Sequence, residues 1–406
     1  MQAHGETRGE QRLALRRARM AAAPPFLRGG FRPFFFGGAL WSLVALTLWL
    51  LALVGALGLP SAFDPLLWHR HEMLFGFVGA VIAGFLLTAI PNWTGRLPIA
   101  GASLAALFAL WFAGRLAMLF SAQIPAGAVA AVDAGFYLVL AGVAAREVIA
   151  AKNRNKPVVG IVLLLGIACA LDHAGAAGLV DPDLGIRAGI TLVVVLISLI
   201  GGRIVPSFTR NWMARKGITD RQPTQPGRFD MAVIAATAVA LGAWIVWPLA
   251  TATGALLIAS GLLQLARLSR WGGLRSLRDP LVFILHVGYF WVPFGLVLLG
   301  VSIFGLAVPR SAAIHALTAG AMGTMILAVM TRATLGHTGR ELKAGPATSL
   351  LYLLITIGAA LRVAAPTGIV DYTLGMEVAA LAWAGAFLLF LVAYGPMLFA
   401  DRGRQA

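Results

Sequence analysis

Two stretches of the chain repeat one pattern of histidine, small apolar residues and arginine. Residues 71–96 read HEMLFGFVGAVIAGFLLTAIPNWTGR, and residues 315–340 read HALTAGAMGTMILAVMTRATLGHTGR. Each stretch begins with a histidine, continues through an apolar helix and ends on Thr-Gly-Arg, with the same spacing from histidine to arginine. The repeat predicts two equivalent membrane helices with imidazoles at equivalent depths, which is typical of a binding site at a pseudosymmetry axis.

An imidazole within an apolar helix needs a hydrogen-bond partner, a metal ion or water. Neutral nitrogen donors suit haem iron and copper, whereas the predicted helices have few carboxylates with which to surround a hard cation. For any single histidine, the alternative is a bridge between helices or an anchor at the membrane interface. Several histidines in one layer of the membrane would instead favour a metal or haem site.

The segment WHRHEM is the densest polar cluster at any predicted helix start. His69 and His71 are two residues apart, so on a regular helix they face different directions, and one binds while the other anchors or reaches a second site. Arg70 offers charge-assisted hydrogen bonds to a haem propionate. Glu72 either orients an imidazole or favours the helix N-terminus by its charge. Met73 is either a soft copper ligand or a packing residue.

Three other histidines are candidate ligands: His173, His286 and His337. Cys169 and His173 are four residues apart and share a helix face, with Asp172 beside them. A copper or haem-edge role for this face competes with a buried thiol next to a bridging histidine. His286 precedes an aromatic run that would either wall a flat cofactor or simply pack.

Composition excludes an ordinary soluble domain, because 59% of the residues are hydrophobic and 12% are charged. The net charge of +16 would suggest nucleic acid in a soluble protein, but here Lys and Arg fall in alternate loops. That distribution predicts membrane lipids as the partner, and no nucleic acid. Arg96 and Arg340 either bind propionates or phosphates or extend to a membrane boundary. Cys169 is the only cysteine, which excludes an intramolecular disulfide and covalent CxxCH haem.

The predicted fold is all-α: a basic cytoplasmic N-terminal arm over residues 1–30 and a single twelve-helix membrane domain over 31–400. A bilayer needs about 20 apolar residues for each helical span, and the long apolar stretch 230–268 is divided at Trp247-Pro248. The expected spans are 34–57, 71–92, 101–121, 125–146, 158–179, 186–206, 230–248, 251–268, 280–303, 313–335, 347–365 and 373–399.

The first motif has a third, weaker copy, since PNWT at 91–94 is echoed by PSFT at 206–209. The copies fall on spans two, six and ten, which predicts three pseudo-repeated four-helix units at approximately 34–146, 158–268 and 280–399. Most Lys and Arg residues lie in the N-terminal arm and in the loops from even to odd spans, so both termini are predicted to be cytoplasmic.

This topology distributes the histidines between two layers. The prediction places His69, His71, His173 and His315 near the outer face. The cytoplasmic half is expected to contain His286 and His337. The symmetry-related outer layer favours a histidine-ligated metal or haem site near the periplasmic face.

Five motifs in order resemble the NnrS family: FRPFFFGGALW, the 68–96 segment, IGGRIVPSFTRNW, LHVGYFWVPFG and the 315–340 segment. The resemblance covers about residues 31–394. It implies a polytopic protein of the bacterial inner membrane that contains haem and copper and acts in denitrification and in tolerance of nitric oxide and nitrosative stress. The family-like histidines that it implies are His69, His71, His286, His315 and His337.

The working hypothesis is a non-covalent, b-type haem with His71 and His315 as axial ligands. Copper would bind nearby through some of His69, His173 and Met73, or at a second site that uses His286 and His337. Nitric oxide or an iron-nitrosyl species would be the ligand of this metal.

Two alternatives stay open, and with them the question of whether the protein is an enzyme. The first is a redox enzyme that reduces nitric oxide with electrons from a quinol or a donor protein. Its proton path would need intramembrane carboxylates, for which Asp133 and Glu377 are candidates beside the simpler role of interhelical contacts. The second alternative is a membrane transporter, a class in which internal repeats are common.

Overall fold

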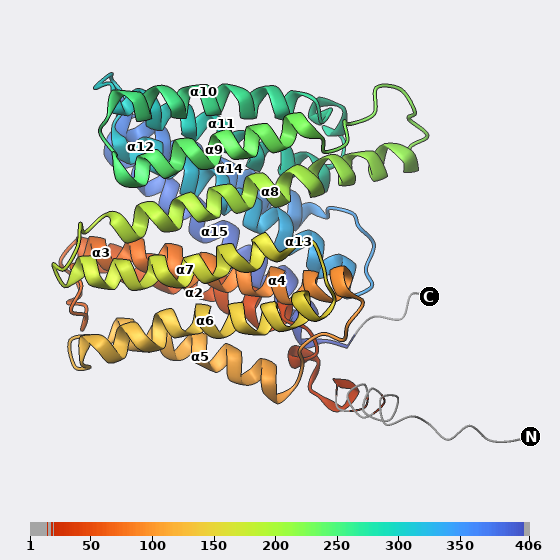
Figure 1. Cartoon of the computed structure of the whole chain (residues 1–406), viewed down its shortest axis with the longest axis horizontal. Helices are drawn as coiled ribbons and strands as arrows, with labels where there is room; N and C mark the ends of the chain where they lie inside the picture. The colour runs from red at the N-terminus through yellow and green to blue at the C-terminus, as the bar shows by residue number, and fades with distance from the viewer. Residues whose placement is uncertain (1–13, 15–17, 19, 402–406) are drawn as a thin grey trace, which may run out of the picture.

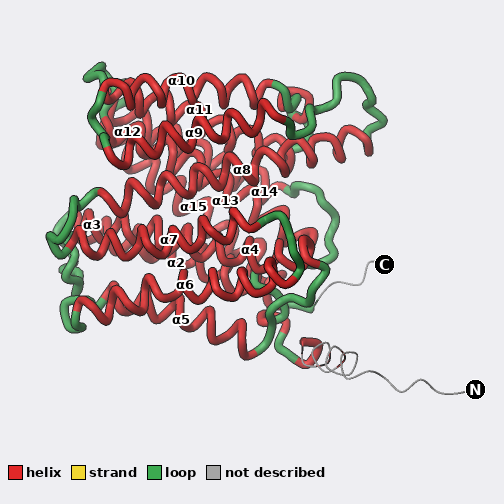
Figure 2. The backbone as a smooth tube through the Cα atoms, viewed as in Figure 1, coloured by secondary structure: helices red, strands yellow, loops and turns green. Residues whose placement is uncertain are grey.

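The computed structural model describes residues 14, 18 and 20–401. The described residues form helices and no strand (Figure 2). Twelve of these helices are long and apolar enough to cross a membrane, so the predicted all-α polytopic fold is confirmed. Most of the basic arm predicted over 1–30 lies outside the described residues. The described part of the arm includes a short 3₁₀ turn, η1 (Pro25–Leu27), which precedes the first long helix.

The long helices follow one another along the chain with short connections. Spans two and ten are each built from an α-helix, a π-helical segment and a second α-helix. In order, the elements are α2 (Phe31–Leu53), α3 (Pro65–His71), η2 (Glu72–Val78), α4 (Gly79–Thr94), α5 (Ala102–Leu119), α6 (Ala126–Ala150), α7 (Lys156–Ala176), α8 (Leu184–Arg215), α9 (Arg228–Val246), α10 (Thr251–Ser269), η3 (Gly273–Ser276), α11 (Pro280–Ile303), α12 (Arg310–His315), η4 (Ala316–Gly323), α13 (Thr324–His337), α14 (Pro346–Ala364), η5 (Ala365–Thr367) and α15 (Tyr372–Phe399).

Two predicted boundaries test the sequence argument. The break expected at Trp247-Pro248 is confirmed, since α9 ends and α10 begins on either side of it. The end predicted for span six at residue 206 is wrong, because α8 continues through Pro206 to Arg215. Trp212 and Met213 in this extension are buried against Val282 of α11, which stabilises the additional turns.

The helices lie side by side along the long axis of the molecule (Figure 1). The start and the finish of the membrane domain meet at one end, where the rings of Phe26 and Phe399 stack at 4.4 Å. We call this the termini end. The opposite, far end contains the α2–α3 and α5–α6 loops, which are joined by a 3.0 Å hydrogen bond between Ser61 and Ser121. The segments around Phe26 and Phe399 therefore lie on the same side of the bundle.

Spans two, six and ten meet in the middle of the bundle. An apolar groove lies between α4, α8 and α13, and its lining includes Ile82, Ile197 and Met325. Gly189 of α8 also packs closely against Leu74 and Phe75 of η2. This arrangement agrees with a common role for the three spans, while the division into three repeated four-helix units stays a prediction.

The two copies of the histidine-to-arginine pattern share local backbone features. A π-helical segment begins immediately after His71 and immediately after His315. Such segments insert an extra residue into a helical turn and are frequent at functional sites. Both copies end with a left-handed glycine, Gly95 at φ 68° and Gly339 at φ 74°. Thr-Gly-Arg is therefore a helix C-terminal signal, with glycine at the position that requires positive φ.

We expect Gly95→Ala and Gly339→Ala each to lower the free energy of unfolding by about 1 kcal/mol, because alanine is strained in the left-handed region. An added Cβ at Gly95 meets no atom within 4 Å, so strain alone would act there. Thermal unfolding of purified protein in detergent measures the change. The matched control is Gly142→Ala in the helical interior of α6, where a Cβ also has open space. Equal stability of wild type and both variants would contradict the assignment of Thr-Gly-Arg as a helix end.

Candidate metal centre

Four potential ligands gather at the far end of the bundle. We call His71, Asp133, Cys169 and His173 the His71 cluster; one ligand atom from each lies within 4.8 Å of those of the others. His71 ends α3, Asp133 lies on α6, and Cys169 and His173 lie one turn apart on α7. All four side chains are buried. The predicted shared face of Cys169 and His173 is thus directed at two other helices.

Asp133 is the centre of the cluster. Its Oδ2 accepts hydrogen bonds from Nε2 of His71 at 2.7 Å and from the Cys169 thiol at 3.2 Å. The same oxygen lies 2.9 Å from Nε2 of His173. Its other oxygen, Oδ1, accepts from the guanidinium of Arg115 on α5. A single carboxylate therefore joins three neighbouring spans.

His71 is bound on both sides of its ring. Nδ1 lies 2.8 Å from Oδ2 of Asp172, while Nε2 contacts Asp133. A neutral imidazole has only one N–H and a carboxylate has none, so two such hydrogen bonds require an additional proton on the ring or on a carboxylate. A metal ion bound at Nε2 would take the place of that proton.

The charges around the His71 cluster are mostly negative. Glu72, Asp133 and Asp172 are all buried. Arg115 bridges the first two, donating to Glu72 at 2.7 Å, and Glu72 also accepts from the Trp41 indole. Asp172 has a guanidinium only at 3.9 Å, that of Arg70. Because buried charges are stable only when compensated, the site favours a cation or bound protons.

A second cluster lies beside the first and has different partners. His69 stacks on Trp49 of α2 with ring centroids 3.9 Å apart. The imidazole of His315 and the guanidinium of Arg362 lie within electrostatic range of His69. Nδ1 of His315 contacts the backbone carbonyl of Ser311 at 2.7 Å. The fold therefore groups His71 with His173 and His69 with His315, whereas the sequence hypothesis paired His71 with His315; the axial-ligand assignment itself stays a prediction.

The remaining predicted metal ligands lie elsewhere. Nε2 of His286 is 2.8 Å from the hydroxyl of Thr209, which makes it a bridge between α11 and α8. The ring of His337 lies 5.5 Å from that of Phe31, near the termini end. Met73 is partly buried and packs against the apolar core. The structure brings none of these three into the His71 cluster.

The three predicted arginines also have particular surroundings. Arg70 forms an ion pair with Asp183 at 2.6 Å. In the same connection between α7 and α8, a hydrogen bond from Arg187 lowers the pKa of Asp181. Arg96 pairs with Glu147 of α6. Nη1 of Arg340 is buried and, within the part of the chain that the structure describes, has no hydrogen-bond partner.

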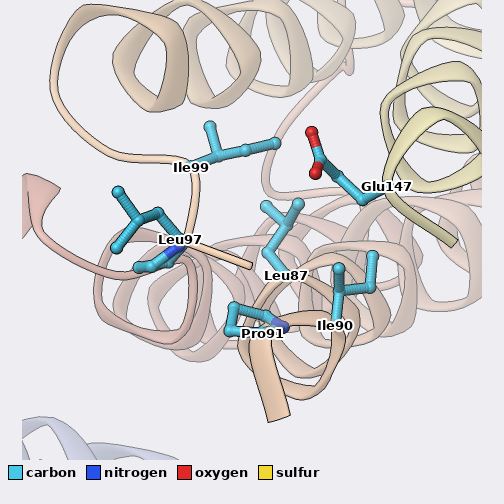
Figure 3. Close-up of a pocket in the computed structure, with 7 residues that line it drawn as sticks. Leu87, Ile90, Pro91, Leu97, Ile99 and Glu147 are labelled. Carbon is cyan, nitrogen blue, oxygen red and sulfur yellow. The ribbon is translucent and has the colours of Figure 1, made fainter. Parts of the chain in front are cut away.

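Glu147 lines a small pocket at the termini end, together with apolar side chains of α4 and of the α4–α5 connection (Figure 3). Figure 3 shows its carboxylate close to Ile99 and Leu87. The pocket contains none of the histidines. It is therefore separate from both histidine clusters.

Sequence reasoning missed most of the polar partners. Asp133 appeared there as a proton-path candidate or an interhelical contact, and Arg115 was not among the candidate residues. The available signal was an arginine and a carboxylate in adjacent apolar spans, because such groups rarely remain unpaired in a membrane. Glu377, the other carboxylate candidate, is exposed on α15 and outside the His71 cluster.

We expect Arg115→Met to destabilise the protein by about 3–5 kcal/mol, because it leaves two buried carboxylates without their cation. Arg146→Met is the control; its side chain is 65% exposed beside Glu147, and the loss of an exposed ion pair costs below about 1 kcal/mol. Thermal unfolding in detergent compares the two variants. Equal losses would show that Arg115 does not support the cluster.

Comparison with known proteins agrees with the sequence resemblance. A family model described as NnrS protein matches residues 25–402. This range includes every helix from α2 to α15 and both histidine clusters. A search of curated proteins found no match. Because the family model covers nearly the whole chain, the protein belongs to the NnrS family.

Proposed function

We propose that this protein binds haem and copper in the bacterial inner membrane and acts in the nitric-oxide response or in protection from nitrosative stress. Membership of the NnrS family supports a role in the nitric-oxide response. The observation that carries the metal proposal is the His71 cluster, with four buried ligand atoms within 4.8 Å of one another. We place this site near the periplasmic face, following the predicted orientation of the termini.

The donors of the His71 cluster fit copper. Two imidazoles and a thiol are ligands that copper prefers, and a carboxylate completes the set. His71, His173 and Cys169 already direct their donor atoms to Asp133. These residues would hold the ion, and the surplus of buried negative charge would favour it. Bound copper would supply a redox-active centre able to bind nitric oxide.

The neighbouring residues would keep the ligands in place. Asp172 fixes the ring of His71 through Nδ1, as carboxylates commonly do for metal-binding imidazoles. Arg115 holds the carboxylates of Asp133 and Glu72 from the opposite side. Burial excludes bulk water from the donors, so their orientation does not depend on solvent.

For haem, His315 is the predicted axial ligand with the better fit. Its Nδ1 is oriented by the Ser311 carbonyl, which leaves Nε2 as the nitrogen for iron. His71 has carboxylates at both nitrogens and suits the copper cluster better. Non-covalent attachment follows from the sequence, which has no second cysteine for a CxxCH motif.

One observation favours the alternative of a donor-linked reductase for nitric oxide. Polar contacts connect the half-exposed Asp183 through Arg70 and Asp172 to His71 and Asp133. These groups mark a polar route from the far end toward the cluster, which a reductase would need for its protons. Anaerobic consumption of nitric oxide by purified protein with a reductant would separate turnover from binding.

We expect purified protein to bind copper, and His173→Ala and Cys169→Ser each to weaken that binding at least about tenfold. Affinity should rise with pH by up to about tenfold per unit for each displaced proton, because ligands must be deprotonated to bind metal. Elemental analysis and titration with a competing chelator measure both effects. His286→Ala is the control, since His286 contacts Thr209 instead. Copper loss in the control but not in the cluster variants would contradict this site.

We expect the purified protein to show b-type haem absorption, and His315→Ala to lose haem or shift its Soret band through loss of an axial nitrogen. Absorption spectra and haem extraction measure this, with His286→Ala again as the control. Addition of nitric oxide should shift the spectrum of the wild type. Unchanged haem content and spectra in His315→Ala would remove the ligand assignment.

A further inference from the structure

The cluster around His69 has donors without acceptors. We call Trp49, His69 and Arg362 the donor cluster; they come from α2, α3 and α14. The indole of Trp49 stacks on the His69 ring at 3.9 Å with an interplanar angle of 21°. His69 and Arg362 lie within electrostatic range of each other and of His315.

Three nitrogens of this cluster are buried without a hydrogen-bond partner among the described residues. They are Nε1 of Trp49, Nδ1 of His69 and Nη1 of Arg362. The indole and guanidinium groups can only donate, and the imidazole donates in one of its tautomers. A buried donor left unpaired costs free energy, and more so when it is charged. Three of them in one cluster indicate that an acceptor belongs there.

The charge of the donor cluster is opposite to that of the His71 cluster. The ionisable groups within electrostatic range of His69 are His315 and Arg362. Arg362 also lies within electrostatic range of His315 and of Tyr372. No carboxylate is among these groups in the described part of the chain. A bare cation is therefore disfavoured by Arg362, whereas an anion would be attracted.

We propose that the donor cluster binds a small oxyanion of the nitrite and nitrate class. Delocalised charge on two or more oxygens allows one such ion to accept from a guanidinium and from neutral N–H groups at once. Oxyanion binding does not depend on copper or haem. The choice of nitrite within the class does rest on the proposed function, because nitrite is the product of one-electron oxidation of nitric oxide in water.

The helix α3 would then contribute one histidine to each of two neighbouring binding sites. His71 belongs to the group that favours a cation, and His69, two residues earlier, belongs to the group that favours an anion. A nitrogen oxyanion would lie next to the imidazole of His315. The far end of the bundle would thus bring an oxyanion close to a metal without placing both on the same ligands.

The test is titration of the purified full-length protein with sodium nitrite and sodium nitrate by isothermal calorimetry, with chloride and acetate as comparison anions. Saturable nitrite or nitrate binding is expected. Arg362→Met should weaken it about ten- to hundredfold through loss of a charge-assisted hydrogen bond, with Arg362→Lys in between. Trp49→Phe keeps the ring, removes the N–H and should weaken binding about fivefold.

Arg310→Met is the matched control, because it removes one positive charge from the same end, where Arg310 lies 3.4 Å from Asp183. Its oxyanion affinity should equal that of the wild type. Elution volume and helical circular dichroism establish that each variant is folded. If Arg362→Met is not folded, the comparison of Arg362→Lys and Trp49→Phe with Arg310→Met decides.

Three results would overturn the proposal: equal affinity in wild type and in the folded Arg362 and Trp49 variants, chloride or acetate binding as tight as nitrite, or oxyanion binding only after haem is removed. The last result would assign Arg362 to a haem propionate. Binding that persists in protein shown to contain neither haem nor copper supports the oxyanion site while refuting the proposed cofactors. The two proposals therefore fail by different measurements.

Discussion

The far end of the bundle depends on the carboxylate of Asp133. It accepts hydrogen bonds from α3, α5 and α7 at a place from which water is excluded. In a low-dielectric interior these contacts are strong, and leaving any of the groups unpaired is costly. The position of His71, and through it the start of span two, follows from this one buried acid and its cation Arg115.

The short helix α3 carries two histidines that belong to two different polar clusters. His69 and His71 are neighbours in sequence, yet one stacks on Trp49 and the other lies between Asp133 and Asp172. Helical geometry causes this division, because side chains two positions apart face different directions. The negatively charged surroundings of the His71 cluster and the positively charged donor cluster can therefore be adjacent without neutralising each other.

Spans two and ten share the backbone features of their repeated pattern but differ in the polar partners of their histidines. The π-helical segments and the left-handed glycines recur in both copies, so the backbone design is shared. The polar partners are not shared: Glu72 follows the first histidine and is bound to Arg115, whereas Ala316 follows the second. Equivalent histidines at the start of equivalent spans thus have different environments.

The sequence by itself determined the twelve spans, the break after α9, and the different directions of His69 and His71, because apolar length and helical periodicity are local properties. The tertiary structure alone decided that His71 lies beside His173 and that His69 lies within electrostatic range of His315. It also gave Asp133, Arg115 and Arg362 their places in the clusters. Periodicity indicates which face of a helix a residue occupies, but the neighbour of that face depends on how helices distant in the chain pack together.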